Sequence, residues 1–413
     1  MKILVFAHQL VVGGTPLNGI ELAAGLRDVG GHDVVVFATP GPMVPYVRCK
    51  ELRFIAAPQA NIYPSPARMK ALRAAVSVEK PDLIHVWDWF QCLDAYYAVH
   101  LPLRVPMVVT DMCMSVTRIL PKSLPTTFGT PELVDLARTS GRKDVHLLLP
   151  PVDIDFNSPF AVDPNAFKGR YGISSNDINL VTVSRLDPWM KGDSLRRTID
   201  AVKMLGTSLP LRLIIVGDGP ARAELESLSK NVNAVLRREA VTLAGEWVDP
   251  RPAYAAADIV VGMGGSALRG MAFAKPVLVV GAAGYCAPFN QETAASFLRQ
   301  GFYGQGSGAQ NNSHWVEQVR RLVTRSSEMS DVGQFSRRFV VEHFALEKIS
   351  ARLSEICVKA AQTSTPSLTA GLVDGLRTAG VYLRERLFLH RPLNALHRYG
   401  DEPVSQSQGA AHG

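Results

Sequence analysis

The chain opens with MKILVFAHQLVVGGTPLNGIELAAGLRDVGGHDVVVF, residues 1–37. An apolar, β-rich run at 2–7 leads into a glycine-bearing loop at 12–16. Apolar residues at helical spacing follow, and a second β-rich run occupies 34–37. Strand, helix and strand within so short a stretch form a βαβ unit, in which the two strands pair in parallel. This unit predicts an α/β protein with a doubly wound parallel sheet.

The same alternation continues through both halves of the chain. In the first half we expect strands at 54–57, 83–86 and 106–109, helices at 66–79 and 91–99, and a closing stretch at 147–153. A linker-like segment at 158–172 precedes strands at 178–184, 211–216, 241–244, 258–262 and 276–280. Helices are expected between these strands at 193–206, 220–230, 251–256 and 266–274, and later at 313–326, 332–344 and 346–362. The pattern predicts domains at 1–157 and 158–345, helices within 346–399 and a disordered tail at 400–413.

Composition bounds the class of protein. A chain of 413 residues has room for two or three domains. Hydrophobic residues make up 47% and charged residues 20%, which fits a globular protein and excludes a disordered one. The formal net charge of +7 favours anionic partners such as nucleotides, phosphates or acidic lipids. No run of Lys and Arg is dense enough for a nucleic-acid-binding arm, so no nucleic acid partner is expected.

The cysteines and the N-terminus bear on the compartment. The 5 cysteines are scattered and form no CxxC pair, so neither a zinc site nor a disulfide framework is expected. A reducing, cytoplasmic compartment is the simplest interpretation. The first apolar run is too short for a signal peptide or a membrane span, and fits a buried strand.

A pair of cations marks the start of the second domain's candidate ligand site. The segment 183–192 has the sequence VSRLDPWMKG. A strand carries Arg185 into a loop, and Lys191 stands near the start of the next helix. Two cations beside a helix N-terminus suit a diphosphate. The alternative is that both are solvated surface charges.

Two glycine-bearing segments follow the later strands. The sequence LIIVGDGP ends a strand in a tight turn that contains Gly217 and Gly219, where backbone could approach a ligand. Gly264, Gly265 and Ser266 open a helix whose free N–H groups could hold phosphate. The alternative is that these glycines serve only a tight turn and the close packing of strand on helix.

In this order and spacing, the three segments resemble the donor-binding domain of the retaining glycosyltransferases of family 4, which have the GT-B fold. The first half resembles the same family at Gly13-Gly14, 20–23, 31–34, 81–85 and 150–153. The resemblance covers roughly residues 1–360. It implies two Rossmann-like domains that face each other across a cleft, the first on the acceptor side and the second binding the nucleotide-sugar donor.

The resemblance also assigns roles to individual residues. Arg185 and Lys191 match the basic pair that binds the donor diphosphate and stabilises the leaving nucleoside diphosphate. Gly14, beside Gly13, matches a glycine whose backbone approaches the diphosphate. The other donor-side matches are the turn glycines Gly217 and Gly219, the helix start at Gly264, Gly265 and Ser266, and Glu246 where the family grips the base. Neither a metal nor a cofactor is implied, because in this family the cations and dipoles take the place of a metal.

The third segment departs from the family pattern. The family usually carries two glutamates there, and the second accepts hydrogen bonds from the ribose hydroxyls. Arg269 stands at the second position, and no glutamate fills the first. Arginine offers no hydrogen-bond acceptor, so ribose recognition is unassigned. Arg269 could instead contact a phosphate or form a structural ion pair.

The first domain departs from the family as well. A histidine often follows the strand at 106–110, whereas Asp111 stands there in this chain. Its carboxylate could orient the acceptor or stabilise positive charge at the anomeric carbon, or it could be a helix cap or turn residue. Asp88 lies among aromatic residues that suit stacking on a sugar, which makes it an acceptor-site candidate, although such aromatics are more often core. His8 could edge the same cleft.

The C-terminal region carries a leucine stripe. Its apolar residues at helical spacing are Leu368, Leu372, Leu376, Ala379, Leu383 and Leu387, and its arginines are Arg377, Arg384, Arg386 and Arg391. One interpretation is a peripheral membrane helix. The other, which we favour, is a helix that crosses back and packs on the first domain, although three glycines weaken the helix prediction.

These observations predict a cytoplasmic glycosyltransferase that moves a sugar from a nucleoside diphosphate donor to an acceptor hydroxyl, with retention and without metal. The acceptor could be a small molecule, a lipid-linked sugar or a polysaccharide. The alternatives are an epimerase of the same fold and a nucleotide-sugar-binding protein with a degenerate catalytic site. A Rossmann dehydrogenase is disfavoured, because the first loop lacks GxGxxG.

Overall fold

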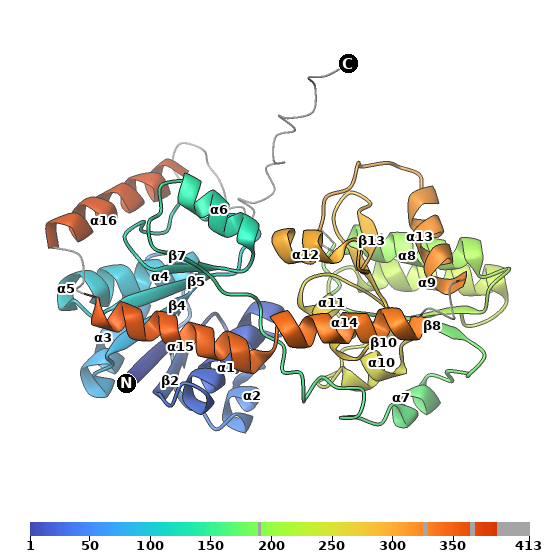
Figure 1. Cartoon of the computed structure of the whole chain (residues 1–413), viewed down its shortest axis with the longest axis horizontal. Coiled ribbons are helices and arrows are strands. Elements are labelled where there is room, and N and C mark those ends of the chain that lie inside the picture. The colour runs from blue at the N-terminus through green and yellow to red at the C-terminus, as the bar shows by residue number, and fades with distance from the viewer. Residues whose placement is uncertain (189–190, 325–328, 364–367, 386–413) are drawn as a thin grey trace, which may run out of the picture. The chain divides into compact units, whose positions relative to one another are not determined.

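The computed structural model describes residues 1–188, 191–324, 329–363 and 368–385. The chain divides into two compact units, each built around its own sheet (Figure 1). One unit comprises Met1–Pro151 and the segment from Leu346 onward, and the other comprises Val152–Ala345. The boundary therefore falls after residue 151, where the sequence suggested 157. The tail expected at 400–413 lies outside the described residues.

The first unit contains a parallel sheet of seven strands in the order β3-β2-β1-β4-β5-β6-β7. The strands are β1 (Lys2–Phe6), β2 (Asp33–Ala38), β3 (Arg53–Ala56), β4 (Leu83–Trp87), β5 (Met107–Asp111), β6 (Thr126–Phe128) and β7 (Val145–Leu147). The helices are α1 (Gly14–Asp28), α2 (Val44–Cys49), α3 (Pro66–Glu79), α4 (Asp88–Ala95), the π-helix η1 (Tyr96–His100), α5 (Leu101–Leu103), α6 (Pro131–Thr139), α15 (Leu346–Gln362) and α16 (Leu368–Leu383).

The first sheet is buried on both faces, as the apolar run of the first strand predicts. Ile3 and Val5 of β1 belong to a core cluster shared with α1 and α15, whereas Leu4 and Phe6 belong to the opposite cluster with α3 and α4. Strands buried on both sides need apolar residues at every position, which is why β1 shows no polar alternation.

The second unit contains a sheet of six strands in the order β10-β9-β8-β11-β12-β13, in which only β13 runs antiparallel to its neighbour. The strands are β8 (Ile178–Val183), β9 (Leu211–Val216), β10 (Val241–Gly245), β11 (Ile259–Gly262), β12 (Val277–Val280) and β13 (Cys286–Pro288). The helices are α7 (Asn165–Arg170), α8 (Gly192–Leu205), α9 (Arg222–Leu236), α10 (Arg251–Ala256), α11 (Gly265–Ala272), α12 (Ala294–Gln300), α13 (Ser313–Thr324) and α14 (Met329–His343).

Several short elements have no sequence signal strong enough to predict them. They are α2, β6, α6, β13, α12 and α7, the last within the segment interpreted as a linker. β6 shows why, because its three residues are a strand only through pairing with β5 and β7 on either side. The helix expected at 91–99 begins at Asp88 and changes into the π-helical turn η1.

The last two helices pack on the first unit. α15 lies against α1, where a side chain at Gly25 would collide with Ser350. α16 binds the π-helical turn, because the hydroxyl groups of Tyr96 and Tyr97 donate to its backbone carbonyls. Across the described ranges, no helix is both long and apolar enough to cross a bilayer. The positions of the leucine stripe beyond residue 385 lie outside those ranges.

Candidate functional site

The carboxyl end of β8 carries the predicted basic pair. Arg185 follows the strand and is exposed, and Lys191 is the residue that precedes α8. Burial and the positive charge of Arg185 lower the pKa of Lys191 to about 8, against the opposing charge of Asp187. A lysine in this state gains most from a bound anion, which would restore its preference for the charged form. Trp189 and Met190, between the two cations, lie outside the described residues.

The turn after β9 holds the basic loop in place. Gly217 has φ +138°, and a Cβ there would collide with the Ser184 carbonyl. The Leu186 amide donates to the Asp218 carbonyl at 2.9 Å, which joins the two loops through backbone. Close packing therefore already accounts for Gly217, and a Cβ on Gly219 would likewise crowd Leu186. Within the described chain, the turn's clearest effect is to position Arg185.

The third segment lies next to the basic loop in the sheet, because β11 pairs directly with β8. At the start of α11, the Gly264 amide donates to Phe302 O at 2.7 Å, and the Ser266 amide donates to Met263 O at 3.2 Å. These two N–H groups are thus occupied, which leaves fewer donors for phosphate than the sequence suggested. Strand order reverses between β8 and β11, and such reversal points are where ligands bind in doubly wound sheets.

Arg269 turns back along its own helix. Its guanidinium donates to the Gly265 carbonyl at 3.2 Å, which places the charge beside the first turn of α11. Ser266 Oγ accepts a hydrogen bond from the Tyr254 hydroxyl at 3.2 Å, and burial raises the pKa of that phenol. This position fits the phosphate-contact alternative for Arg269, which stays a prediction.

Glu246 is exposed directly after β10, and its neighbour Trp247 is anchored. The indole N–H of Trp247 donates to the Tyr171 hydroxyl at 3.0 Å, and its ring packs edge-on against Phe167. The anchored indole holds the backbone at 246 at the strand end, where the resemblance places the base.

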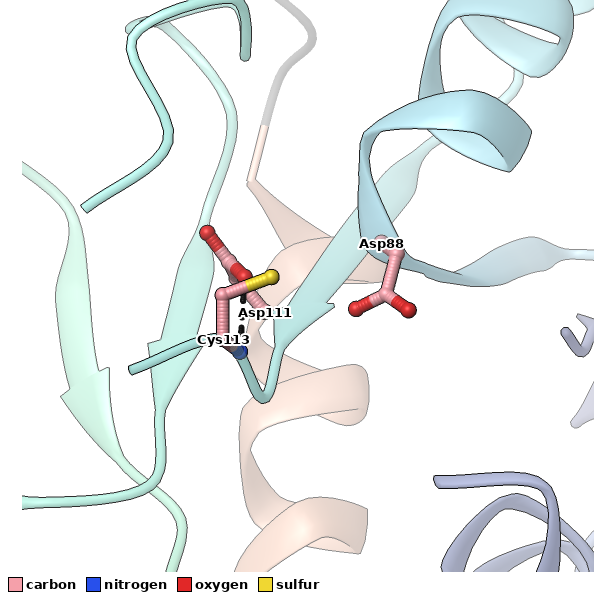
Figure 2. Close-up of side chains that lie close together, drawn as sticks. All are labelled: Asp88, Asp111 and Cys113. Carbon is pink, nitrogen blue, oxygen red and sulfur yellow. Dashed lines mark hydrogen bonds between the residues drawn. The ribbon is translucent and has the colours of Figure 1, made fainter. Parts of the chain in front are cut away.

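In the first unit, two carboxylates gather at the ends of β4 and β5. Ligand atoms of Asp88, Asp111 and Cys113 all lie within 4.8 Å of one another (Figure 2). Oδ1 of Asp111 accepts the Cys113 amide at 3.1 Å and Oδ2 accepts the Thr117 amide at 3.4 Å, so Asp111 acts as the turn residue that the sequence allowed. No sequence pattern identifies this group, because its members come from two strands.

Asp88 is the most perturbed of these groups. It is 5% exposed and has φ +56°, a left-handed conformation that non-glycine residues seldom adopt. Burial and the charge of Asp111 raise its pKa to about 7, although the Met112 amide stabilises the carboxylate. His8, two residues after β1, brings its Nε2 to 3.9 Å from Asp88 Oδ2. Strand order reverses between β1 and β4, so this pair stands at the ligand-binding position of the sheet.

The Asp88, Asp111 and Cys113 group could hold a cation, and its donor set can be judged. Two carboxylates suit a hard cation. Burial and the two carboxylates raise the pKa of the Cys113 thiol well above its ordinary value, which keeps the thiol protonated and makes it a poor ligand. The backbone amides of Cys113 and Thr117 already donate hydrogen bonds to Asp111, so they would compete with a cation for its carboxylate oxygens. The donor set therefore fits a metal poorly.

A cavity of about 180 Å³ adjoins the same edge of the first sheet, lined among others by His8, Gln9, Thr39, Tyr63 and Phe90. Gln91 also lines it, and Oε1 of this buried amide accepts no hydrogen bond from the described residues. Trp87 and Trp89 are fully buried core residues, as the alternative interpretation allowed. Of the aromatic residues near Asp88 in sequence, Phe90 is the one that lines the cavity.

The glycine loop of the first unit leads into α1. Gly13 precedes the helix in an extended conformation, and Gly14 is its first residue. A Cβ added at Gly14 would meet nothing within 4 Å. Packing among the described residues therefore does not require Gly14 to lack a side chain.

Two Rossmann-like domains, one with a basic pair at its strand ends, define the GT-B class of glycosyltransferases. The model of Glycosyltransferase Family 4 matches residues 12–111, and that of Glycosyl transferases group 1 matches residues 177–302. The chain belongs to the glycosyltransferases that combine these two domains, and it is accordingly a glycosyltransferase. No curated protein matches it significantly.

Solved structures with this fold extend over nearly the whole chain. A glycosyltransferase from Rickettsia africae ESF-5 has a TM-score of 0.70 at 16% identity, covering 88% of this chain and 99% of its own. Anabaena Alr3699/HepE in complex with UDP-glucose has a TM-score of 0.68 at 16% identity, covering 87% and 100%. Sucrose-phosphate synthase from Thermosynechococcus elongatus has a TM-score of 0.65 at 15% identity, covering 87% and 98%. At these identities the likeness shows the fold.

Proposed function

We propose that the protein transfers a hexose from a UDP-sugar to an acceptor hydroxyl, with retention at the anomeric carbon and without a metal. The observation that carries the proposal is the cation pair Arg185 and Lys191 at the carboxyl edge of the second sheet, with the Lys191 pKa lowered to about 8. UDP is chosen because the similar Anabaena protein was crystallised with UDP-glucose.

The basic pair serves the leaving group. As the glycosidic bond breaks, negative charge grows on the diphosphate. Two fixed cations therefore stabilise the transition state more than the ground state. Arg269, beside the first turn of α11, supplies a third cation to the same phosphates. The backbone at Gly14 can approach the diphosphate because this residue has no side chain. The protein's own packing leaves the space at this position open, and a side chain would fill it.

The acceptor binds at the first unit's strand ends. The amide and hydroxyl groups of Gln9, Thr39 and Gln91 can hydrogen-bond to a polyhydroxylated molecule, and Phe90 offers an apolar face. Asp88, with His8 beside it, orients the hydroxyl that attacks. Asp111 shapes this edge by holding the loop after β5 and by raising the pKa of Asp88.

The proposal extends to location and partners. We propose a cytoplasmic location, which the five unpaired cysteines favour. We also propose a membrane partner, contacted peripherally through α16.

The decisive experiment compares Arg185→Ala and Lys191→Ala with the control Lys230→Ala, an exposed lysine on α9. UDP binding is measured by calorimetry, and UDP-sugar hydrolysis by release of UDP. Each site variant should lose hydrolysis about a hundredfold, whereas the control keeps it. Full hydrolysis in both site variants would refute the assigned roles. Hydrolysis after EDTA treatment tests metal independence, and the anomeric configuration of the product tests retention.

A binding protein or an epimerase of the same fold is the second candidate. Arg269 favours it, because the expected ribose acceptor is missing at that position. A binding protein would be stabilised by UDP without hydrolysing the sugar. An epimerase would interconvert nucleotide sugars without an acceptor, which analysis of the products by chromatography detects.

A further inference from the structure

The cavity beside His8 is lined by a buried amide whose oxygen lacks a hydrogen-bond donor. Gln91, on α4, is 3% exposed and belongs to the cavity wall. Its Oε1 atom accepts no hydrogen bond from the described residues. A buried acceptor without a donor lowers the stability of the protein. Because such atoms are rare in folded proteins, this one points to a donor that arrives with a ligand.

Two hydroxyl groups that line the same cavity also offer acceptors. Thr39 Oγ1 donates to the Pro58 carbonyl at 3.3 Å, and the Tyr63 hydroxyl donates to the Ala60 carbonyl at 3.1 Å. Each hydroxyl has a single proton, so both present only lone pairs for a further hydrogen bond. Together with Gln91 Oε1, these atoms favour a ligand that brings several O–H donors.

The charges around the cavity disfavour an anionic ligand. Arg68 lines the cavity, but its Nε donates to Oδ2 of Asp94 at 2.7 Å, and the two side chains are 4% and 0% exposed. The charge of the guanidinium is therefore already balanced by a buried carboxylate. Asp88, beside the lining residue His8, adds negative charge when it is ionised. A carboxylate or a phosphate would meet this charge and the acceptors described above.

The size and the aromatic wall of the cavity suit one sugar ring. Its volume of about 180 Å³ corresponds to about six waters at liquid density, and is smaller than the roughly 300–1,000 Å³ of pockets for drug-sized ligands. The rings of Tyr63 and Phe90 line it with their centroids 4.2 Å apart. A monosaccharide unit has an apolar ring face for such a wall and hydroxyl groups along its edge for the acceptors.

We propose that this cavity binds a single uncharged sugar ring, and that Gln91 accepts a hydrogen bond from one of its hydroxyl groups. Gln91 thereby selects ligands with a hydroxyl group at this position, because a ring without it would leave the buried oxygen unpaired. The assignment of this ring to the acceptor rests on the proposed function, whereas its binding to the cavity does not.

The test is saturation-transfer NMR with the full chain, with and without UDP. The neutral probes are the methyl glycosides of glucose, galactose and mannose, together with myo-inositol. The anionic probes are the methyl glycosides of the three corresponding uronic acids. At least one neutral glycoside should show saturation transfer, and the matching uronic acid should bind about tenfold more weakly.

Two variants test the acceptors. Gln91→Leu should weaken binding of the neutral probe about tenfold. Without a ligand, it should also melt at a higher temperature than wild type, because it removes an unpaired buried acceptor, whereas a merely structural amide predicts a lower one. Thr39→Val keeps the shape of the side chain and should weaken binding about threefold. The matched control is Gln334→Leu, at an exposed position of α14, which should leave binding unchanged.

Lack of saturation transfer to every neutral probe would overturn the proposal, and so would a uronic acid that binds as tightly as its neutral counterpart. Unchanged binding in Gln91→Leu, or a lower melting temperature of this variant, would refute the role of Gln91. UDP-sugar hydrolysis is measured separately. A protein that binds the neutral probe without hydrolysing UDP-sugar keeps this site and loses the proposed function, and the reverse result refutes the site alone.

Discussion

The carboxyl edges of the two sheets share the same reversal of strand order and have opposite chemistry. In the second unit the edge presents cations, an exposed Arg185 and a Lys191 whose pKa is about 8. In the first unit it presents buried carboxylates, with the pKa of Asp88 raised to about 7. A doubly wound sheet thus fixes where a ligand binds, and the side chains after each strand decide its charge. A cationic edge suits a diphosphate, whereas an acidic edge suits a neutral hydroxyl compound.

The glycines of the two edges should respond differently to the same substitution, and this is the largest expected effect. Gly217→Ala should destabilise the protein by about 3 kcal/mol, because a Cβ would collide with the Ser184 carbonyl at a positive φ. Gly14→Ala should leave stability nearly unchanged and weaken UDP binding. Urea unfolding and calorimetry measure both. An equal loss of stability in the two variants would contradict this difference between Gly217 and Gly14.

The acidic edge should make the stability of the folded protein depend on pH. The pKa of Asp88 is raised to about 7 from its ordinary 3.8, so the folded state prefers the protonated carboxyl. The stability from that preference is complete below pH 3.8 and lost as the pH rises through 7. Asp88→Asn copies the neutral form, and its advantage over wild type should grow by about 2.6 kcal/mol between pH 5 and pH 8. Urea unfolding at both pH values tests this, and a constant difference would contradict it.

The cationic edge should show its pH dependence in ligand binding. A bound diphosphate raises the pKa of Lys191 above its value of about 8 in the free protein. The affinity contributed by the ammonium group is complete below pH 8 and lost above it, so the Kd for UDP should rise about tenfold from pH 7.5 to pH 9. Lys191→Arg, which stays charged, is the control and should show a flatter profile in calorimetry. Parallel profiles would remove Lys191 from the site.

The smallest expected effect is that of a substitution at Arg269. Arg269→Glu restores the residue type usual in the family, adding a ribose acceptor and removing a cation from the start of α11. These changes oppose each other, so the affinity for UDP should change by only about threefold, whereas the affinity for inorganic diphosphate should fall about tenfold. Competition binding with both ligands separates the two effects. An equal fall for both would show that the new glutamate gains no ribose contact.

The sequence brings the second unit's candidate residues together more directly than the first unit's. Arg185 and Lys191 lie within one loop, so local spacing was enough to pair them. The grouping of Asp88, Asp111, Cys113 and His8 joins three strand ends that are distant in the chain. The short strand β6 was missed for the same reason, since its hydrogen-bond partners lie on other strands.

The sequence alone determined the alternation of strands and helices, the two tandem domains and the basic loop after β8, because periodicity and turn residues act over a few neighbouring positions. Only the tertiary structure decided which carboxylates meet, which way α16 turns its leucines and why Gly14 and Gly217 differ. Those properties depend on burial and on contacts between residues far apart in the chain, and the pKa of Asp88 and the exposure of the α16 leucines follow from such contacts.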